Sequence, residues 1–456
     1  MSHSSSDPMP WRFAPGKPLS GSLTVPGDKS ISHRALILSA LAVGKSRISG
    51  LLEGEDVLAT AAALRAMGAT IDRTGKGEWQ VHGVGVGSLL QPNGALDMGN
   101  SGTSARLLMG LVASHPIAAS IIGDASLSCR PMARVTAPLG QMGAQFTTSP
   151  GDTLPLIVQG ICPAIPIRYR LPVASAQVKS AIMLAALNTP GITEIIEPVP
   201  TRDHSENMLR GAGADVRVEC DDDGTRHIFV TGEAELKPQN IIVPGDPSSA
   251  AFFIVAALIV PGSDLVIRKV GMNPTRAGLI TLLQQMGGDI TEIDRHDVGG
   301  EPVADLRVCA SALTGVEVDH GLVPSMIDEF PILFVAAAMA NGMTRTSGLD
   351  ELRVKESDRL AEMAHGLKAL GVMVEENPDG LVIEGRDGAP FTPAAPVSID
   401  RVLDHRIAMS FAIAGLMTTG GVTISDMAPV ATSFPDFSAL LLRVTGGQDA
   451  SAGLTV

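Results

Sequence analysis

The sequence is poor in aromatic residues and has fewer basic than acidic residues, and each shortage argues against a class of partner. Aromatic residues make up 3% of the 456 residues, which leaves few side chains on which nucleic-acid bases could stack. The formal net charge is −14, and an acidic surface does not attract nucleic acid or anionic membranes. We therefore expect neither kind of partner, although a local basic cleft remains compatible with this charge.

Cysteines and long apolar runs are also scarce. Cys129, Cys162, Cys220 and Cys309 are scattered without the spacing of metal ligands, and four cysteines in a chain of this length do not make a disulfide framework. The longest apolar run, Ala250 to Val260, is shorter than the roughly 20 residues of a membrane span. The N-terminus has no apolar signal region. These absences predict a cytoplasmic protein with reduced thiols and no metal.

What the chain does contain is enough apolar sequence for a large core, arranged in two related halves. Hydrophobic residues make up 45% of the chain and charged residues 18%, and the length suggests two or more domains. The segment Val25–Ser30, Val-Pro-Gly-Asp-Lys-Ser, returns as Val243–Ser248, Val-Pro-Gly-Asp-Pro-Ser. One half therefore serves as an internal control for the other.

The two copies differ at two cations. Aligning them places Pro247 opposite Lys29 and Phe252 opposite Arg34. The turn and the helix after it can therefore be built without either cation. We expect Lys29 and Arg34 to hold a ligand rather than to serve the fold, the ordinary alternative being a capped helix with solvated charges.

A search for internal repeats finds six related units. Each opens with polar residues, continues into an almost unbroken apolar helix, and contains a second, amphipathic helix that ends at a glycine. The openings lie near Pro26, Gly99, Pro172, Pro244, Pro324 and Leu403. The glycines are Gly68, Gly143, Gly213, Gly287, Gly371 and Gly446. Because a helix that is apolar all round must be enclosed by protein, we predict an α/β fold of three units per half around buried helices.

Basic residues gather at these openings. If the buried helices share a direction, their N-termini converge on one surface, where free N–H groups and the helix dipole favour anions. The cations predicted to face one cleft are Lys29, Arg34, Arg106, Arg130, Lys355, Arg359 and Arg406. Such a set indicates a pair of anionic substrates. Taken singly, Arg130 is equally well explained as a surface cation.

Carboxylates accompany the cations in the second half. Asp328 and Glu329 directly precede a very apolar helix, where burial could raise a carboxyl pKa enough for base chemistry. Lys355 and Arg359 are four residues apart and are predicted to share a helix face, with Glu356 beside them. The alternatives are favourable placement at a helix dipole and an edge of surface ion pairs. His405 is interpreted as a structural hydrogen-bonding residue.

These segments resemble the 5-enolpyruvylshikimate-3-phosphate (EPSP) synthase family. The matching motifs, in the family's order, are Pro26–Arg34, Gly99–Thr103, Arg130-Pro131, Ser175–Gln177, Leu352–Arg359 and Asp404–Arg406. The resemblance implies a two-domain enolpyruvyl transferase fold of six βαβαββ repeats, three per domain, around buried parallel helices. It implies that residues 27–242 form the shikimate 3-phosphate domain, that residues 1–26 and 243–456 form the second domain, and that the active site lies in the cleft between them.

The family's reaction is a step of the shikimate pathway of aromatic amino acid biosynthesis. The 5-hydroxyl of shikimate 3-phosphate adds to C2 of phosphoenolpyruvate while C3 gains a proton, and phosphate is then eliminated from the tetrahedral adduct. The resemblance assigns Lys29, Asp328 and Glu356 to catalysis, with Asp328 accepting the hydroxyl proton and Glu356 or Lys29 serving C3. It implies a transferase without metal or organic cofactor, and we expect a monomer.

The resemblance also implies the residues that bind each substrate. Those for shikimate 3-phosphate are Lys29, Ser30, Arg34, Ser175, Ala176, Gln177, Arg202, Asp328 and Lys355. Those for phosphoenolpyruvate are Lys29, Asn100, Gly102, Arg130, Gln177, Arg359 and Arg406.

Some positions depart from the better-known bacterial and plant pattern. Thr432 stands where that pattern has a lysine, Glu351 replaces an asparagine, and Ala176 replaces a serine, while Arg202 resembles a substitute anion ligand. These departures resemble the divergent class II of the family. In the family, a larger residue at the position of Gly102 crowds the inhibitor glyphosate, and this chain keeps the glycine. We therefore expect the protein to be a glyphosate target. Its sensitivity should be moderate, because the lysine that Thr432 replaces is missing.

Two other functions compete with this interpretation. An enolpyruvyl transferase acting on UDP-N-acetylglucosamine would share the fold, but it normally carries a reactive cysteine where this chain has Ala125. A non-catalytic phosphate-binding scaffold would have no use for Asp328 and Glu356, because carboxylates repel an anionic ligand.

Overall fold

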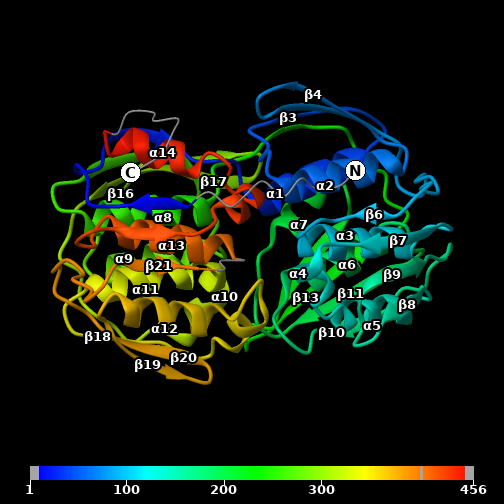
Figure 1. Cartoon of the computed structure of the whole chain (residues 1–456). Coiled ribbons are helices and arrows are strands. Elements are labelled where there is room, and N and C mark those ends of the chain that lie inside the picture. Colours follow the sequence, from blue (N-terminus) through cyan, green and yellow to red (C-terminus); the bar gives the residue numbers. More distant parts are fainter. Residues whose placement is uncertain (1–9, 401–403, 447–456) are drawn as a thin grey trace. The chain divides into compact units, whose positions relative to one another are not determined.

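The chain folds into two units of similar construction (Figure 1). The structure is a computed structural model that describes residues 10–400 and 404–446. Unit 1 comprises Met1–Pro26, Gly245–His296 and Pro302–Val456, and unit 2 comprises Gly27–Pro244 and Asp297–Glu301. The family resemblance implied divisions after residues 26 and 242, and nothing in the sequence indicated that residues 297–301 group with unit 2.

Unit 2 contains three four-stranded sheets, each with its own helices. The first has β3 (Gly44–Ser49), β4 (Thr70–Gly75), β5 (Glu78–Gly83), β14 (Asn240–Ile242), α1 (Lys29–Leu41) and α2 (Glu55–Ala66). The second has β6 (Leu96–Asp97), β7 (Ala118–Ile122), β8 (Gln145–Ser149), β9 (Thr153–Gln159), α3 (Gly102–Ala113), α4 (Ala125–Ser128) and α5 (Ala133–Gln141). The third has β10 (Arg168–Arg170), β11 (Ile192–Glu197), β12 (Val216–Cys220), β13 (Arg226–Thr231), α6 (Ala176–Ala186) and α7 (His204–Gly211).

Unit 1 repeats this plan with one four-stranded and two three-stranded sheets. The first repeat has β2 (Ser20–Thr24), α8 (Pro247–Ile259), β15 (Asp264–Gly271), α9 (Gly278–Gln285), β16 (Asp289–Val298) and β17 (Glu301–Cys309). The second has η1 (His320–Leu322), α10 (Val323–Met326), η2 (Ile327–Glu329), α11 (Phe330–Met339), β18 (Met343–Arg345), η3 (Asp350–Val354), α12 (Arg359–Ala369), β19 (Met373–Asn377) and β20 (Gly380–Glu384). The third has β21 (Val397–Ile399), α13 (His405–Gly415), β22 (Val422–Ile424), η4 (Ala428–Thr432), α14 (Phe437–Val444) and β1 (Trp11–Phe13).

Two strands each stand directly before one copy of the repeated segment and pair in the sheet of the other copy. β14 directly precedes the second copy, which begins at Val243, and it pairs in parallel with β3 in unit 2. β2 comes at the start of the chain but pairs in parallel with β15 in unit 1. β2 therefore lies just before the change of unit at Pro26-Gly27, and β14 just before the change at Pro244-Gly245. The chain also changes unit at His296-Asp297 and at Glu301-Pro302.

The first helix of each repeat lies in the core, as predicted. Every residue of α8 and of α11 is buried. In unit 1, α8, α11 and α13 contact one another, and in unit 2, α3 contacts α1 and α6 (Figure 1). The predicted helix-ending glycines also have positive φ, which a residue with a side chain rarely adopts. The sixth predicted opening, Leu403, lies outside the described residues.

By length and composition alone, one helical stretch in the described part of the chain, His320–Met339, could cross a membrane. It runs through η1, α10, η2 and α11, and 72% of its apolar window is buried within the protein. The core helix of a soluble protein passes the same test, so this is weak evidence for a span.

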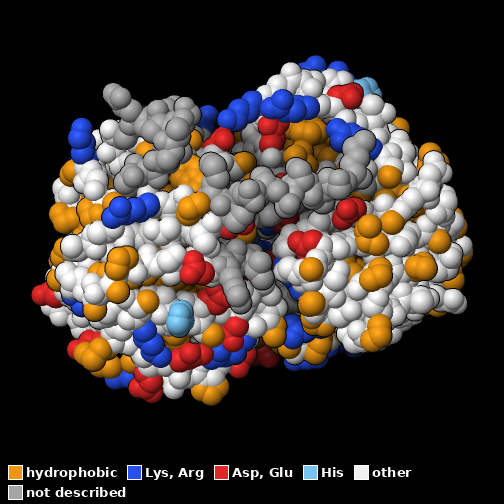
Figure 2. All heavy atoms as spheres, in the orientation of Figure 1, with side chains coloured by type: hydrophobic (Ala, Val, Ile, Leu, Met, Phe, Trp, Pro, Cys, Tyr) orange, Lys and Arg blue, Asp and Glu red, His pale blue; other side chains and the backbone are white. Residues whose placement is uncertain are grey.

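Charged side chains of both signs are present on the face shown in Figure 2. Over β19 and β20 of unit 1, acidic and basic side chains lie next to one another, while basic side chains gather near β3 and β4 of unit 2. The charge on this face is therefore mixed rather than acidic throughout.

Candidate active site

In unit 2, the first candidate cation stands at the start of α1. The carboxylate of Asp28 caps this helix by accepting a hydrogen bond of 2.8 Å from the backbone N–H of Ile31. Lys29 is the first helical residue, and its ammonium group forms an ion pair with Asp56 of α2. The Lys29 side chain is 21% exposed, so it is held by the protein and still open to solvent.

Arg34 lies deeper and joins three helices of unit 2. Its Nε donates to Ser205 Oγ of α7 at 2.7 Å, and its NH2 group donates to Ser180 Oγ of α6 at 2.6 Å. Its NH1 group donates to the carbonyl of Ser30 at 2.9 Å. Burial lowers the pKa of Arg34 to about 10, although the Glu206 carboxylate opposes this shift. The sequence identified this cation but not its serine partners.

The second copy shows what replaces Arg34 where no cation is present. Phe252 is buried and packs edge to face against Phe437, with ring centroids 6.0 Å apart. The position is therefore a core position in both copies. In the first copy this position holds Arg34, whose guanidinium group donates hydrogen bonds to side chains of two other helices.

Arg202 lies close to Arg34 in the same unit. It belongs to the loop between β11 and α7 and is half-buried, and its charge contributes to lowering the pKa of Arg34. Two guanidinium groups within electrostatic reach repel each other, and a bound anion relieves this repulsion.

A second set of polar residues surrounds the start of α3. Arg130 donates from NH2 to Asn100 Oδ1 at 2.6 Å and to Ser126 Oγ at 3.1 Å. A Cβ atom added to Gly102 would lie 2.6 Å from Arg106 NH1 and 3.3 Å from Arg130 NH1. The absence of a side chain at Gly102 therefore allows two guanidinium groups to approach the N-terminus of the helix.

The start of α6 adjoins the same residues. Ser175 caps this helix, whose first residue is Ala176. Gln177 accepts a hydrogen bond of 2.9 Å from Arg106 NH1 and donates one of 3.0 Å to Thr103 Oγ1. The structure thus brings together the predicted residues at the starts of α3 and α6. Arg106, which the sequence placed at the cleft without a substrate role, connects them.

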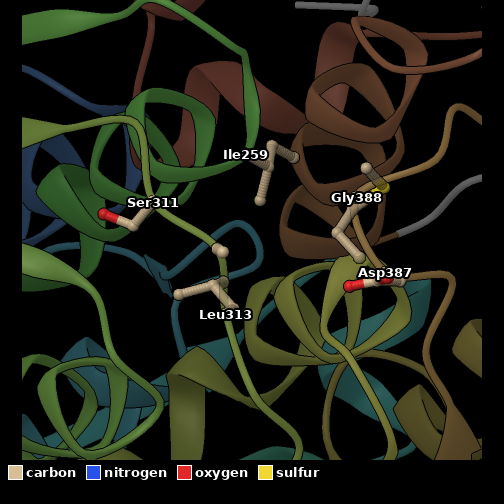
Figure 3. Close-up of a pocket in the computed structure, with 7 residues that line it drawn as sticks. Ile259, Ser311, Leu313, Asp387 and Gly388 are labelled. Atoms are coloured by element: carbon tan, nitrogen blue, oxygen red, sulfur yellow. The ribbon is translucent and has the colours of Figure 1, made fainter.

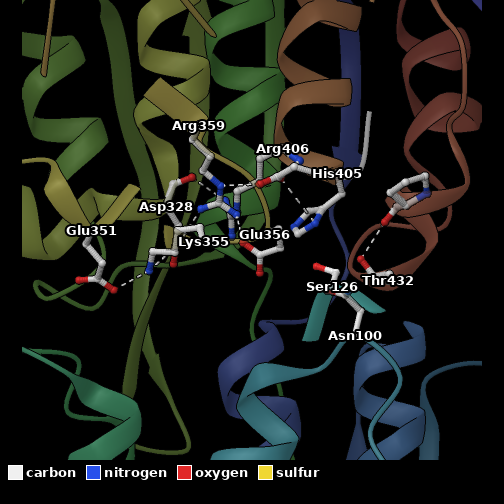
Figure 4. A network of polar contacts seen from close by, with 12 residues as sticks. Asn100, Ser126, Asp328, Glu351, Lys355, Glu356, Arg359, His405, Arg406 and Thr432 are labelled. Carbon is white, nitrogen blue, oxygen red and sulfur yellow. Dashed lines mark hydrogen bonds and ion pairs between the residues drawn. The ribbon is translucent and has the colours of Figure 1, made fainter. Parts of the chain in front are cut away.

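In unit 1, Arg359 is the centre of a group of carboxylates (Figure 4). Its Nε donates to Asp404 Oδ2 at 2.7 Å, its NH2 to Glu356 Oε2 at 2.6 Å, and its NH1 to Asp328 Oδ1 at 3.3 Å. Its side chain is 1% exposed. Burial alone would lower the pKa of Arg359, but the three carboxylates outweigh burial and raise it. Arg359 is therefore a fixed, permanently charged group.

Lys355 and Arg406 contact the same residue, Asp328, from other segments. Lys355 Nζ lies 2.7 Å from Glu351 Oε1 and 3.8 Å from Asp328 Oδ1. Arg406 NH1 donates to the backbone carbonyl of Asp328 at 2.9 Å. In Figure 4, Lys355, Arg359 and Arg406 point toward Asp328.

One prediction about this segment is wrong. Lys355 and Arg359 do not share a helix face, because η3 ends at Val354 and α12 begins at Arg359. Lys355 has a non-helical ψ of −146°, and the Asp358 carboxylate caps a new helix by accepting from Ala361 N at 3.1 Å. Lys355 and Arg359 are neighbours because both contact Asp328, and their spacing in the sequence is not the reason.

Two further carboxylates belong to this cluster: Asp404, to which no role was assigned from the sequence, and Glu329, which was named there beside Asp328. Asp404 is fully buried, binds Arg359 through Oδ2, and accepts from the backbone N–H of Arg406 at 2.8 Å through Oδ1. Glu329 is also buried, accepts a hydrogen bond from Ser248 Oγ, and lies 3.6 Å from Arg406 NH1. An acidic residue directly before an apolar helix was the available signal for Asp404.

Thr432, singled out in the sequence, is the last residue of η4. Its hydroxyl donates to the carbonyl of Pro429 at 2.7 Å within η4. Within the described ranges there is no group of three or more His, Cys, Asp or Glu residues that could hold a metal ion.

A separate cavity of unit 1 lies at the other ends of its core helices (Figure 3). It has about 310 Å³ of empty space including its mouth, and its walls include Ile259, Leu313, Met339 and Gly388. Ile259 and Met339 are the last residues of α8 and α11, whereas Arg359 and Arg406 stand at helix starts. This cavity is therefore not the candidate site.

Each unit thus gathers charged groups at the starts of its helices. Unit 2 presents ammonium, guanidinium, hydroxyl and amide groups, which suit phosphate and carboxylate oxygens. Unit 1 combines three cations with carboxylates that can accept or donate protons. Binding of anions and proton transfer are both within the chemistry of these groups.

Comparison with known proteins matches these observations. The family EPSP synthase (3-phosphoshikimate 1-carboxyvinyltransferase) matches residues 13–441. A protein of Sphingopyxis alaskensis named 3-phosphoshikimate 1-carboxyvinyltransferase is 69% identical over 436 residues, which cover 95% of this chain and 97% of that protein.

Solved structures show the same fold. An EPSP synthase from Acinetobacter baumannii has a TM-score of 0.84 at 47% identity, and the match covers 95% of this chain and 98% of that chain. The enolpyruvyl transferase NikO from Streptomyces tendae has a TM-score of 0.73 at 20% identity, covering 96% and 98%, and supports the fold alone. The predicted α/β enolpyruvyl transferase fold and the predicted family are confirmed. The chain belongs to the EPSP synthase family.

Proposed function

We propose that this chain transfers the enolpyruvyl group of phosphoenolpyruvate to the 5-hydroxyl of shikimate 3-phosphate and releases phosphate. The observation that carries this proposal is the family match over residues 13–441, which spans both polar clusters. The reaction joins two anionic substrates, and the described cations of both units are suited to anions.

Unit 2 is proposed to bind shikimate 3-phosphate. Ser30, Ser175 and Gln177 offer hydroxyl and amide groups at the starts of α1 and α6. Lys29, Arg34 and Arg202 supply the positive charge, and Ala176 stands beside them. Asn100, Gly102 and Arg130, around the start of α3, are assigned to phosphoenolpyruvate, and Lys29 and Gln177 to both substrates.

Unit 1 is proposed to supply the proton chemistry and the remaining charge. Asp328 accepts the proton of the 5-hydroxyl while the hydroxyl oxygen forms a bond to C2 of phosphoenolpyruvate. Glu356 or Lys29 delivers a proton to C3. Loss of a C3 proton then re-forms the double bond as the C2–phosphate bond breaks. Lys355 completes the shikimate 3-phosphate set, and Arg359 and Arg406 hold the phosphoenolpyruvate anion and stabilise the charged adduct.

Under this proposal residues 27–242 form the shikimate 3-phosphate domain, and residues of both units act on one pair of substrates. The chain is further proposed to act as a cytoplasmic monomer without metal or organic cofactor. Light scattering of the purified protein should give the mass of a single chain, and a mass of two chains would contradict the monomer.

A phosphate-release assay tests the proposed function. Purified protein is mixed with phosphoenolpyruvate and either shikimate 3-phosphate or UDP-N-acetylglucosamine. We expect release only with shikimate 3-phosphate. Release with the nucleotide sugar alone would favour the other enolpyruvyl transferase, and calorimetric binding of shikimate 3-phosphate without any release would favour a non-catalytic scaffold.

The class II character and the inhibitor response are finer proposals. Thr432, Glu351, Ala176 and Arg202 depart from the common pattern as described above. In this structure an added Cβ at Gly102 would crowd the Arg106 guanidinium at 2.6 Å. We predict that Gly102→Ala raises the inhibition constant for glyphosate by about tenfold or more, because one lost anion contact has this size. An unchanged constant would count against a steric role for Gly102.

A further inference from the structure

Unit 2 contains a buried charge cluster to which the proposed mechanism gives no role. Lys179 of α6 is fully buried, and its Nζ lies 2.9 Å from Glu197 Oε1 and 2.8 Å from Glu206 Oε1. The two carboxylate side chains are 0% and 2% exposed. Burying three charged groups costs desolvation free energy. This cost is offset only when the groups form ion pairs and hydrogen bonds with one another.

The cluster holds both ends of one loop. Glu197 is the last residue of β11, and Glu206 lies in the first turn of α7. Glu197 Oε1 also accepts hydrogen bonds from the backbone N–H of Thr201, at 3.1 Å, and from its hydroxyl. Because a single lysine binds both carboxylates, residues 198–203 between them are fixed at each end. Arg202 belongs to this loop.

The same elements hold Arg34. Ser180 follows Lys179 on α6, Ser205 precedes Glu206 on α7, and their hydroxyl oxygens lie 2.7 Å apart. Arg34 donates to both of them, at 2.6 Å and 2.7 Å. A change in the position of α7 relative to α6 would therefore move the hydrogen-bond acceptors of Arg34.

We propose that Lys179 is a positioning residue for shikimate 3-phosphate, which acts by fixing the loop of Arg202 and the serines that orient Arg34. The inference rests on the proposed function, because it assigns Arg34 and Arg202 to that substrate. Lys179 does not touch the substrate under this proposal. The competing explanation is that the cluster only stabilises the fold.

Steady-state kinetics of Lys179→Met distinguish the two explanations. We expect the KM for shikimate 3-phosphate to rise about tenfold or more, while the KM for phosphoenolpyruvate and kcat change less than about threefold, since ground-state binding of one substrate is what is lost. The rise in melting temperature caused by shikimate 3-phosphate alone should shrink in parallel. A folded Lys179→Met protein with the parent's KM would overturn the proposal.

A milder variant decides the question if Lys179→Met does not fold. Thr201→Val removes one hydrogen bond to Glu197 at nearly constant volume. The matched control is Thr231→Val, because the Thr231 hydroxyl donates to Asp215 at 2.7 Å on the exposed edge of the same unit. We expect Thr201→Val to raise the KM for shikimate 3-phosphate about threefold or more, the size of one modest hydrogen bond. Equal constants for the two variants would overturn the proposal.

The parent protein separates this inference from the proposed function. If the parent releases no phosphate from the two substrates, the proposed function fails. If the parent is active and the variants bind shikimate 3-phosphate as the parent does, only the role of Lys179 fails.

Discussion

Arg359 is the residue at the centre of the polar cluster of unit 1. Its three nitrogens bind Asp404, Glu356 and Asp328, and its side chain is almost completely buried. Replacing Arg359 would leave several carboxylates without their cation, so a loss of activity would not separate catalysis from folding. A change at one carboxylate at the edge of the cluster is more informative.

Glu356→Gln is that change. The glutamine amide oxygen can still accept the 2.6 Å hydrogen bond from Arg359 NH2, so we expect a folded protein that binds both substrates. Proton transfer at C3 is lost, and the rate should fall by about a hundredfold or more, the usual contribution of a general acid or base. Phosphate release and calorimetric binding together check this. A parental rate would remove Glu356 from the chemistry.

Single residues were identified from the sequence more readily than their partners. The loss of Lys29 and Arg34 from the second copy marked them as candidates. Ser180 and Ser205, which hold Arg34, are 146 and 171 residues away, and a serine on a helix carries no local signal of such a contact. Lys355 was correctly grouped with Arg359, but for a wrong reason, since a capping aspartate begins a new helix between them.

At the scale of elements, the contact between α3 and α6 depends on a glycine. A Cβ atom at Gly110 would lie 2.2 Å from the backbone carbonyl oxygen of Ala181, and a backbone atom cannot move aside as a side chain can. Gly110→Ala should therefore lower the free energy of unfolding by about 1–3 kcal/mol, the usual cost of overpacking.

Urea denaturation measures this loss, with Gly140→Ala as the control. Gly140 lies in α5, and among the described residues nothing lies within 4 Å of an added Cβ there. This variant should be neutral or slightly stabilising, because alanine favours a helix over glycine. Similar stabilities for the two variants would contradict the close approach of α3 and α6.

The third sheet of unit 2 offers a test by pH. His227 on β13 binds Glu194 and Asp221, and the hydrogen bond to Glu194, followed by that to Asp221, raises the pKa of His227 above its ordinary value of 6.5. Its folded pKa is thus above its unfolded pKa. The stabilisation is fully present below the unfolded value and disappears as pH rises through the folded value.

We therefore expect His227→Gln to be less stable than the parent at pH 6 and to approach the parent's stability in alkaline solution. Urea denaturation of both proteins across this pH range measures the difference. A difference that is constant with pH, or that grows as pH rises, would contradict the ion pairs of His227.

The order of the elements followed from the sequence, but their pairing did not do so completely. The glycines after the second helices and the apolar first helices repeat along the chain, which made six units predictable. The repeats alone do not indicate that β2 and β14 each pair in the sheet of the other copy, because strand pairing depends on contacts between distant residues. The same is true of residues 297–301, a hairpin turn that groups with unit 2. The family resemblance, by contrast, implied that residues 1–26 belong to the second domain and residues 27–242 to the first.

At the scale of the whole molecule, one duplicated plan has diverged into two kinds of polar cluster. In unit 2 the cations of α1 are bound to Asp56, Ser180 and Ser205. In unit 1 the equivalent helix α8 begins with Pro247 and buries Phe252 in an aromatic cluster. The polar cluster of unit 1 is instead built around Arg359, and its residues come from the second and third repeats of that unit. Divergence of this kind is expected if each half serves a different part of one reaction.

The kinetic constants of Lys29→Met test most directly whether the cations at the helix starts serve the substrates rather than the fold. Lys29 has a proline in its place in the second copy, so the helix does not need it. We predict that kcat/KM for both substrates falls by about a hundredfold or more, the size expected for a charge that contacts the reacting groups. The melting temperature should stay close to that of Lys45→Met, a control at an exposed lysine of the same unit. Parental kinetics per folded molecule would show that Lys29 serves the fold and not the substrates.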